Sequence, residues 1–401
     1  MNLITLDLDS IRLGQPLPFA LRGNDGALLA RRGFVVQSRE ELDILLRRGR
    51  MLCVDTDESD NHHRAYVGKL YDLVRGESTL GEIATMKLGT DDMYASGEPE
   101  PPALPDWLEL QTRVNLLLRS PSHPDFLGKL DRISQALLHH SRLHPDATLF
   151  ALVHLSAVEL RMYSATHVLL VCAICLIAAR EVLAWPEDIE PTLAKATLTM
   201  NLSMAGLQDL LAVQTSPLTS DQIRHIEQHA ERSVLLLQRL GVTDEAWLEA
   251  VRAHHDRAPG PLADKPLGQR LARLMQRADA FAAKLSPRAS RWPMAPAAAM
   301  QTSYYDEEHQ VDEAGASLIK AMGVYSPGSF VRLATQEIAV VIRRGANTTT
   351  PKTAVVINKQ GMPTSEFAVR DTSLPTYRIV ASVPHRDVKV QLPLDRLLTL
   401  I

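Results

Sequence analysis

The sequence predicts a mainly α-helical protein: an orthogonal multi-helix bundle flanked by a small N-terminal α+β module and a small β-rich C-terminal module. Its 401 residues are 45% apolar, 22% charged and only 5% aromatic, which is typical of a soluble, helix-leaning globular protein of two or three domains. From Trp107 to about Met322, apolar residues recur three and four positions apart, as on one face of a helix. After Pro327 this pattern gives way to β-branched runs separated by short polar gaps.

The N-terminal module, residues 1–95, mixes short strand-like and helix-like segments. Asn24-Asp25-Gly26 predicts a tight turn between two apolar stretches. Ser38 with Glu41 predicts a capping box at the start of a helix. Residues 96–106 are rich in proline and glycine, so we expect a semi-rigid linker there.

The helical domain is expected over residues 107–322 and the C-terminal module over residues 323–401. Proline and glycine breaks divide the helical part into about eight or more helices, enough for an orthogonal bundle. In the C-terminal part, Phe330–Leu333, Ile338–Ile342 and a later stretch, Val388–Leu392, are expected to belong to a sheet.

Charge and cysteine usage exclude several classes of protein. The formal net charge of -4 gives no reason to expect nucleic-acid binding. Cys172 and Cys175 lie inside the apolar run Val168–Ala179, where cysteine acts as a small hydrophobe, and no second pair completes a zinc site. That run is shorter than the roughly 20 residues needed to span a bilayer, and the N-terminus does not read as a signal peptide. We therefore expect a cytoplasmic protein without a transmembrane segment.

Five side chains of the helical domain could ligate metal. They are His167, His229, His254, His255 and Asp279. Each alone is weak evidence, because a histidine on a helix is more often a packed or capping residue. Together they supply imidazole and carboxylate groups from four expected helices, which is how helical folds build metal centres in their interior.

These blocks resemble the HD-GYP family of the HD superfamily. Tyr163–His167 is similar to the motif that opens with the family's first metal-binding histidine, and Ser216–His229 is similar to the stretch leading to its third ligand position. Ala253–Arg257 resembles the paired-histidine motif, and Ala272–Asp279 resembles the last ligand-bearing helix. Gly323–Leu333 is similar to the tail that follows many such domains. The resemblance covers more than half of the chain and implies an HD-type bundle related to metal-dependent cyclic di-GMP phosphodiesterases.

The sequence departs from the family where the resemblance places its central chemistry. Met200 and Asn201 stand in place of the histidine–aspartate pair, and Met204 stands in place of the following lysine. Gln214 aligns near the lysine that contacts substrate phosphate. Residues Ala258–Ala263 replace the glycine-tyrosine-proline signature.

These replacements predict loss of catalysis. A neutral amide at Asn201 bridges two cations poorly, and the soft thioether of Met200 does not suit iron(II), manganese or magnesium. Even the loss of groups that only support metal ligands typically costs roughly 10–100-fold in affinity or activity. Without a lysine at Gln214, substrate phosphates also lose a cation. We expect a catalytically degenerate, metal-free regulatory or interaction scaffold of bacterial cyclic di-GMP signalling, with cyclic di-GMP or diguanylate cyclases as partners.

Two alternatives stay open. The five remaining candidate ligands could hold a single iron, manganese or zinc ion and support a residual phosphohydrolase or phosphodiesterase. A related group of HD output domains also lacks metal ligands, but the paired histidines and the C-terminal tail argue against it.

Two further histidine pairs are expected to play no part. The sequence around His139–His140 resembles the family's sequence around the histidine–aspartate pair. However, it precedes His167, whereas in the family the pair follows the first metal-binding histidine. His62–His63 lies in a polar stretch with nothing else to complete a site.

Overall fold

The structure is a computed structural model that describes residues 3–55, except 7, 9, 10 and 18, and residues 106–401, except 365 and 391. The expected linker and His62–His63 therefore lie outside the described residues, apart from Asp106. The chain divides into two compact units, Met1–Thr112 and Arg113–Ile401, which are described separately below.

The described residues of the first unit form a small antiparallel sheet, one complete helix and the beginning of a second helix, α5 (Trp107–Arg119). The sheet has the order β1-β4-β2-β3, formed by Leu3–Thr5, Cys53–Asp55, Leu21–Arg22 and Leu28–Ala30, and the helix is α1, Arg39–Gly49. The predicted turn joins β2 to β3, where Gly26 has a φ of 81°. Ser38 caps α1 by accepting a hydrogen bond from the Glu41 backbone. The Glu41 carboxylate reaches the Gln37 N–H instead of the Ser38 N–H, so only half of the expected capping box forms.

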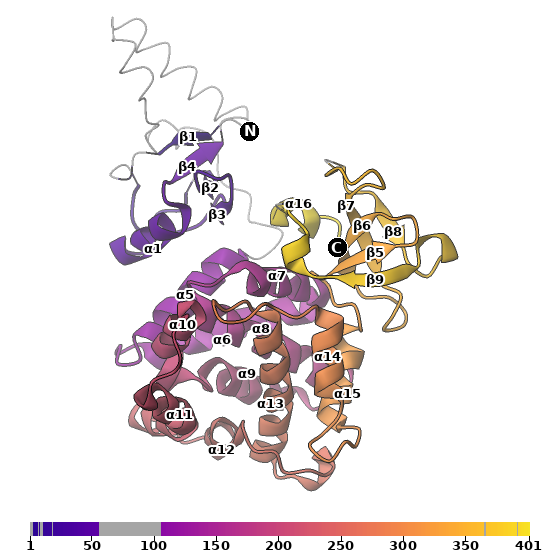
Figure 1. Ribbon diagram of the computed structural model, residues 1–401. Helices are drawn as coiled ribbons and strands as arrows, with labels where there is room; N and C mark the ends of the chain where they lie inside the picture. Colours follow the sequence, from indigo (N-terminus) through magenta and orange to yellow (C-terminus); the bar gives the residue numbers. More distant parts are fainter. Residues whose placement is uncertain are drawn as a thin grey trace, which may run out of the picture. The chain divides into compact units, whose positions relative to one another are not determined.

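The second unit begins with a bundle of helices, as predicted (Figure 1). Its helices are α5 (Trp107–Arg119), which starts in the first unit, α6 (Phe126–Leu143), α7 (Pro145–Val158), α8 (Tyr163–Glu181), α9 (Glu190–Thr199), α10 (Ala205–Val213), α11 (Ser220–Arg239), α12 (Glu245–Ala253), α13 (Leu267–Leu285), α14 (Pro296–Tyr304) and α15 (Glu313–Met322).

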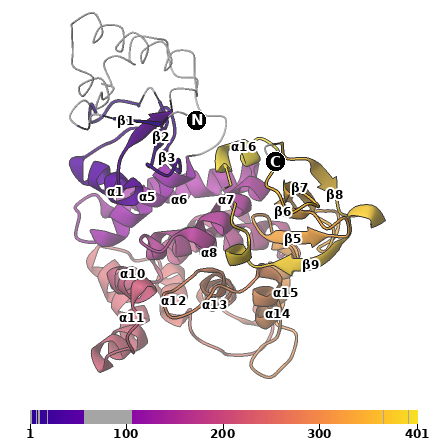
Figure 2. The same cartoon turned by 45° about the horizontal axis from the view of Figure 1, so that its top comes forward.

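Helix α8 is the core of this bundle and packs against α6, α7, α9, α10, α13 and α15. Figure 2 shows it enclosed by its neighbours. With 19 residues it is longer than the apolar run suggested, and by length and composition alone it is the one described helix that could cross a membrane. However, 94% of its apolar window is buried inside the protein, as in the core helix of a globular domain. Cys172 and Cys175 are buried in it as free thiols.

A buried carboxylate fixes the start of α9 against α8. Glu190 accepts hydrogen bonds from Arg180 at 2.7 and 2.9 Å and from Arg142 at 3.0 Å. Burial alone would raise the pKa of Glu190, but the two guanidinium groups outweigh it and lower that pKa.

The C-terminal module is a five-stranded antiparallel sheet. Its strand order is β8-β7-β6-β5-β9, formed by Val369–Asp371, Lys352–Ile357, Ile338–Arg343, Phe330–Leu333 and Ile379–Val383, and α16, Leu394–Leu398, follows it. The predicted fold class is thus confirmed.

One expected strand is absent from the C-terminal module. The described residues of Val388–Leu392 have no strand structure. Pro384 starts a short 3-10 helix, His385–Asp387, and Pro393 precedes α16. Proline has no N–H to donate to a strand ladder, so this stretch runs between two proline-marked turns.

Arg344, directly after β6, joins the sheet to the bundle. Its guanidinium group binds Asp146 on α7 at 2.6 Å and Glu181 on α8 at 2.5 Å, and donates to the Ala321 carbonyl at 2.7 Å. The module therefore docks on the bundle through a cation that satisfies three acceptors from three helices.

Candidate metal and ligand site

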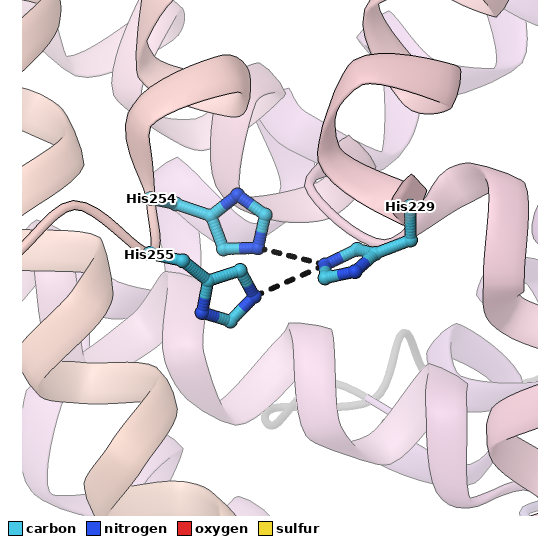
Figure 3. Close-up of side chains that lie close together, drawn as sticks. All are labelled: His229, His254 and His255. Atoms are coloured by element: carbon cyan, nitrogen blue, oxygen red, sulfur yellow. Dashed lines mark hydrogen bonds between the residues drawn. The ribbon is translucent and has the colours of Figure 1, made fainter. Parts of the chain in front are cut away.

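Three of the predicted ligands meet at one point (Figure 3). His229 projects from α11, while His254 and His255 follow the last residue of α12. The Nε2 atom of His229 lies 3.2 Å from Nε2 of His254 and 3.1 Å from Nε2 of His255. His254 is fully buried, His229 is 4% exposed, and His255 is exposed to solvent. We call these residues the histidine triad.

The backbone sets the proton positions in two of the three rings. Nδ1 of His229 lies 2.5 Å from the Ile226 carbonyl, and Nδ1 of His254 lies 2.6 Å from the Val251 carbonyl. A carbonyl only accepts, so each Nδ1 carries the proton and each neutral ring presents an Nε2 lone pair. Burial lowers the pKa of His254 to about 3, with a further contribution from His255, and burial also lowers the pKa of His229. Two lone pairs therefore face each other at 3.2 Å.

This arrangement fits one metal ion. Tetrahedral zinc binds imidazole nitrogen at about 2.0–2.1 Å, which places two such nitrogens about 3.3 Å apart, close to the observed 3.1 and 3.2 Å. Carbonyls that hold Nδ1–H are the usual support for metal-binding histidines. Among the described residues, the triad is the one group of three or more potential ligands that converges this closely.

The other two predicted ligands form a separate pair. His167 on α8 places Nε2 2.6 Å from Oδ1 of Asp279 on α13. Burial would raise the pKa of Asp279, but the hydrogen bond and charge of His167 lower it, as do His254 and His255. Asp279 is thus within electrostatic range of the triad, and the structure resolves the five candidates into a triad and a dyad.

The segment expected to carry the missing pair lies between the two helices of the triad. Helix α9 ends at Thr199, whose hydroxyl accepts a hydrogen bond from the Trp247 indole on α12 at 2.9 Å. Ser203 donates to the His229 carbonyl on α11 at 2.8 Å. Between these anchors, Met200 is fully buried and Asn201 is 5% exposed.

The other positions that depart from the family have local roles. Met204 is 8% exposed and precedes α10. Gln214 forms a reciprocal amide pair with Gln222, at 2.7 and 3.1 Å, and also donates to the Ser216 and Pro217 carbonyls. This side chain therefore ties α10 to the start of α11.

The Ala258–Ala263 loop is held at both ends. The Lys265 ammonium group donates to the Ala258 and Pro259 carbonyls at 3.0 Å. The Leu262 N–H donates to the Glu313 carboxylate at 2.8 Å. The loop is thus fixed against α15 without any of the signature residues.

The sequence reasoning missed two arginines beside the dyad. Arg288 donates to the Tyr163 hydroxyl at 2.9 Å and lies 5.0 Å from its ring, and that ring stacks on His167 at 5.7 Å with planes 9° apart. Arg291 faces Arg288 across a tight turn held by two backbone hydrogen bonds of 3.0 and 3.1 Å. Neither guanidinium group has an acidic partner among the described residues. The available sequence signal was the lack of any acidic residue between Asp279 and Asp306.

Comparison with known proteins gives one curated relative. No family model matches the chain. Over 231 residues the chain is 25% identical to the cyclic di-GMP phosphodiesterase PA4108 of Pseudomonas aeruginosa, a match that covers 56% of this chain and 54% of that protein. The chain thus spans about half the length of this relative.

One solved structure also matches. Bd1817, an HDG"Y"P protein from Bdellovibrio bacteriovorus, aligns with 79% of this chain and 98% of its own at a TM-score of 0.42 and 15% identity.

Proposed function

We propose, from the premise that the helical part of this chain is an HD-GYP-like domain, that the protein is a catalytically degenerate regulator of cyclic di-GMP signalling. It would act in the cytoplasm by binding the nucleotide, or a diguanylate cyclase, without efficient hydrolysis. The observation that carries the proposal is the identity of Met200 and Asn201, which are held between the two helices of the triad.

The chemistry of these two side chains supports loss of turnover. Hydrolysis by paired metals needs closely spaced cations that clamp the attacking and leaving oxygens. A bridging carboxylate offsets the repulsion between two such cations, whereas the Asn201 amide is neutral. The buried Met200 thioether is a soft ligand, unsuited to the hard cations that bind phosphate oxygens. The triad alone then supplies ligands for one ion.

Ligand recognition is supported by the cations beside the dyad. Arg288 and Arg291 lack acidic partners among the described residues, and burial and their mutual repulsion lower the pKa of Arg291. Guanidinium groups in this state bind phosphate oxygens well, because an anion removes the repulsion between them. A phosphodiester bound there would approach the His167–Asp279 dyad through Tyr163.

The test is calorimetry with cyclic di-GMP together with metal analysis and product chromatography on one preparation. We expect binding without turnover in the wild type. The double variant M200H/N201D restores both ligands and should raise bound metal and turnover together, whereas M200A/N201A is the matched control. Metal-dependent hydrolysis by the wild type at a rate that M200A/N201A leaves unchanged would refute the proposal.

The histidine triad favours a second candidate function, a single-metal phosphohydrolase. Three imidazoles would leave a fourth coordination position open, as in catalytic zinc sites, and an ion held there would lower the pKa of a water ligand toward neutrality. His229, His254 and His255 would hold the ion, and the Asp279–His167 dyad would hold a proton nearby. Stoichiometric zinc, iron or manganese that is lost in H254A but kept in H139A, with metal-dependent cleavage of bis(p-nitrophenyl) phosphate, would favour this candidate over the first.

A further inference from the structure

The turn between α13 and α14 presents the most exposed large apolar side chain among the described residues. Trp292 is 71% exposed and directly follows Arg291. The guanidinium group of Arg386, from the C-terminal module, lies 5.5 Å from the centre of the Trp292 ring. An indole that packs on one arginine and is otherwise open to solvent offers a surface on which another flat group can stack.

The backbone of the turn is anchored at both ends although Arg291 and Trp292 are exposed. The Ala289 N–H donates to the Ala212 carbonyl of α10 at 2.7 Å, and the Met294 N–H donates to the Lys284 carbonyl at 2.8 Å. Arg288 and Arg291 form a closed backbone pair within it. Because the backbone is fixed from both sides, the Cα positions of these arginines and of Trp292 are set before any ligand binds, which reduces the backbone part of the ordering cost of binding.

The positive charges near this turn are largely not neutralised by acidic side chains of the described residues, which favours binding of an anion. Lys284, Arg288 and Arg291 form no ion pair among the described residues, and Arg386 has only Asp387, at 3.5 Å. Burial lowers the pKa of Lys284, and the charges of Arg291 and Arg277 lower it further. The Nε atom of Arg288 is buried and has no hydrogen-bond partner. A donor that is buried and unsatisfied calls for an acceptor, which an ordered water or a bound anion would supply.

We propose that Trp292 and Arg386 form a stacking platform for a nucleobase, next to a phosphate-binding pair formed by Arg288 and Arg291. This proposal rests on the proposed function and assigns to each residue the part of the nucleotide that it would contact. Stacking on an aromatic ring combined with arginine contacts to phosphate is how many proteins hold nucleotides, and the stacking tolerates any base with a π-face. The platform would hold a guanine of cyclic di-GMP, with Trp292 as the residue that distinguishes a nucleotide from a bare phosphate ester.

The experiment compares two probes on the 401-residue chain. Calorimetry with cyclic di-GMP and with ribose 5-phosphate separates base recognition from phosphate recognition. We expect W292A to weaken cyclic di-GMP binding roughly 5–150-fold and to leave ribose 5-phosphate binding unchanged, whereas W292F keeps most of the affinity. R291Q should weaken both probes. W185F, at a half-buried tryptophan elsewhere in the bundle, is the matched control and should change neither.

Fluorescence gives an independent readout. A stacked guanine quenches indole emission, so cyclic di-GMP should quench the wild type and W185F, and the quenching should disappear in W292F although that variant still binds. Wild-type binding with unchanged affinity in W292A, or equal quenching in W292F, would overturn the platform while leaving the proposed function intact. Failure of the wild type to bind cyclic di-GMP at all would overturn both.

Discussion

Asp312 gives the sharpest test of how the last helices are held against the bundle. It is 7% exposed and accepts hydrogen bonds from Arg273 at 2.5 and 2.9 Å and from Arg277 at 3.3 Å. It also caps α15 by accepting from the Gly315 N–H at 2.7 Å. The two arginines are 4% and 5% exposed, and Glu307 is their other acidic partner among the described residues.

The structure sets the size of the expected effect. Removing one partner of a buried ion pair costs about 3–5 kcal/mol, because the other charge stays buried. Loss of a helix cap costs about 1 kcal/mol more. We therefore expect D312A to lower the free energy of unfolding by about 4–6 kcal/mol. D312N keeps an acceptor for the cap and should lose about 1 kcal/mol less.

Urea unfolding followed by circular dichroism measures these differences. D221N is the control, because Asp221 pairs with Arg224 on the exposed face of α11 and such pairs contribute at most about 1 kcal/mol. A loss below about 1 kcal/mol in D312N would refute the reasoning, since Arg273 and Arg277 would then not depend on the Asp312 charge.

Three further predictions concern burial and capping. Burial, with some help from the charge of His385, lowers the pKa of His154 to about 4, and burial lowers the pKa of His385 to about 4 against its hydrogen bond to the Gly328 carbonyl. Between about pH 6.5 and 4, His154 and His385 are therefore protonated in the unfolded chain but neutral in the folded one. Urea titrations should show the free energy of unfolding falling as the pH drops through this range, and this fall should be less steep in H385N. Burial raises the pKa of Cys172 to about 12 and that of Cys175 well above its usual value, so neither should react with a thiol reagent until the protein unfolds, as mass spectrometry of the labelled peptides would show. T219A should destabilise the protein by about 1 kcal/mol in thermal or urea unfolding through loss of the α11 cap, and T219S should not.

The fold class was predictable because many helices of the bundle bury repeating apolar positions, and several of them, such as α5, α6, α11 and α15, are followed within two residues by proline or glycine. Phe330–Leu333 is a strand with the predicted bounds. The strand predicted at Val388–Leu392 was wrong because its β-branched residues lie between two prolines that redirect the backbone. The length of α8 was underestimated because the helix begins with buried polar residues such as Thr166 and His167, which lie before the apolar run Val168–Ala179.

The candidate site was only partly predictable. Histidine type and spacing indicated His229, His254 and His255, but their division from His167 and Asp279 depends on helix packing that no local pattern encodes. The tautomers follow from the Ile226 and Val251 carbonyls, whose positions exist only after α11 and α12 have formed. Arg288 and Arg291 were overlooked because an unpaired cation is recognised by what surrounds it in space.

The histidine triad is divided between α11 and α12, so the distances between its nitrogens depend on the distance between these two helices. The His229 and His254 rings are each oriented by a carbonyl of their own helix, so a shift of α11 relative to α12 would move their Nε2 atoms apart. Metal–imidazole distances tolerate only about 0.2 Å, so a displacement of even 1 Å would abolish the site. The affinity of an ion held by the triad would therefore depend on the packing of these two helices, and a partner that draws α11 away from α12 would weaken ion binding without contacting the ion.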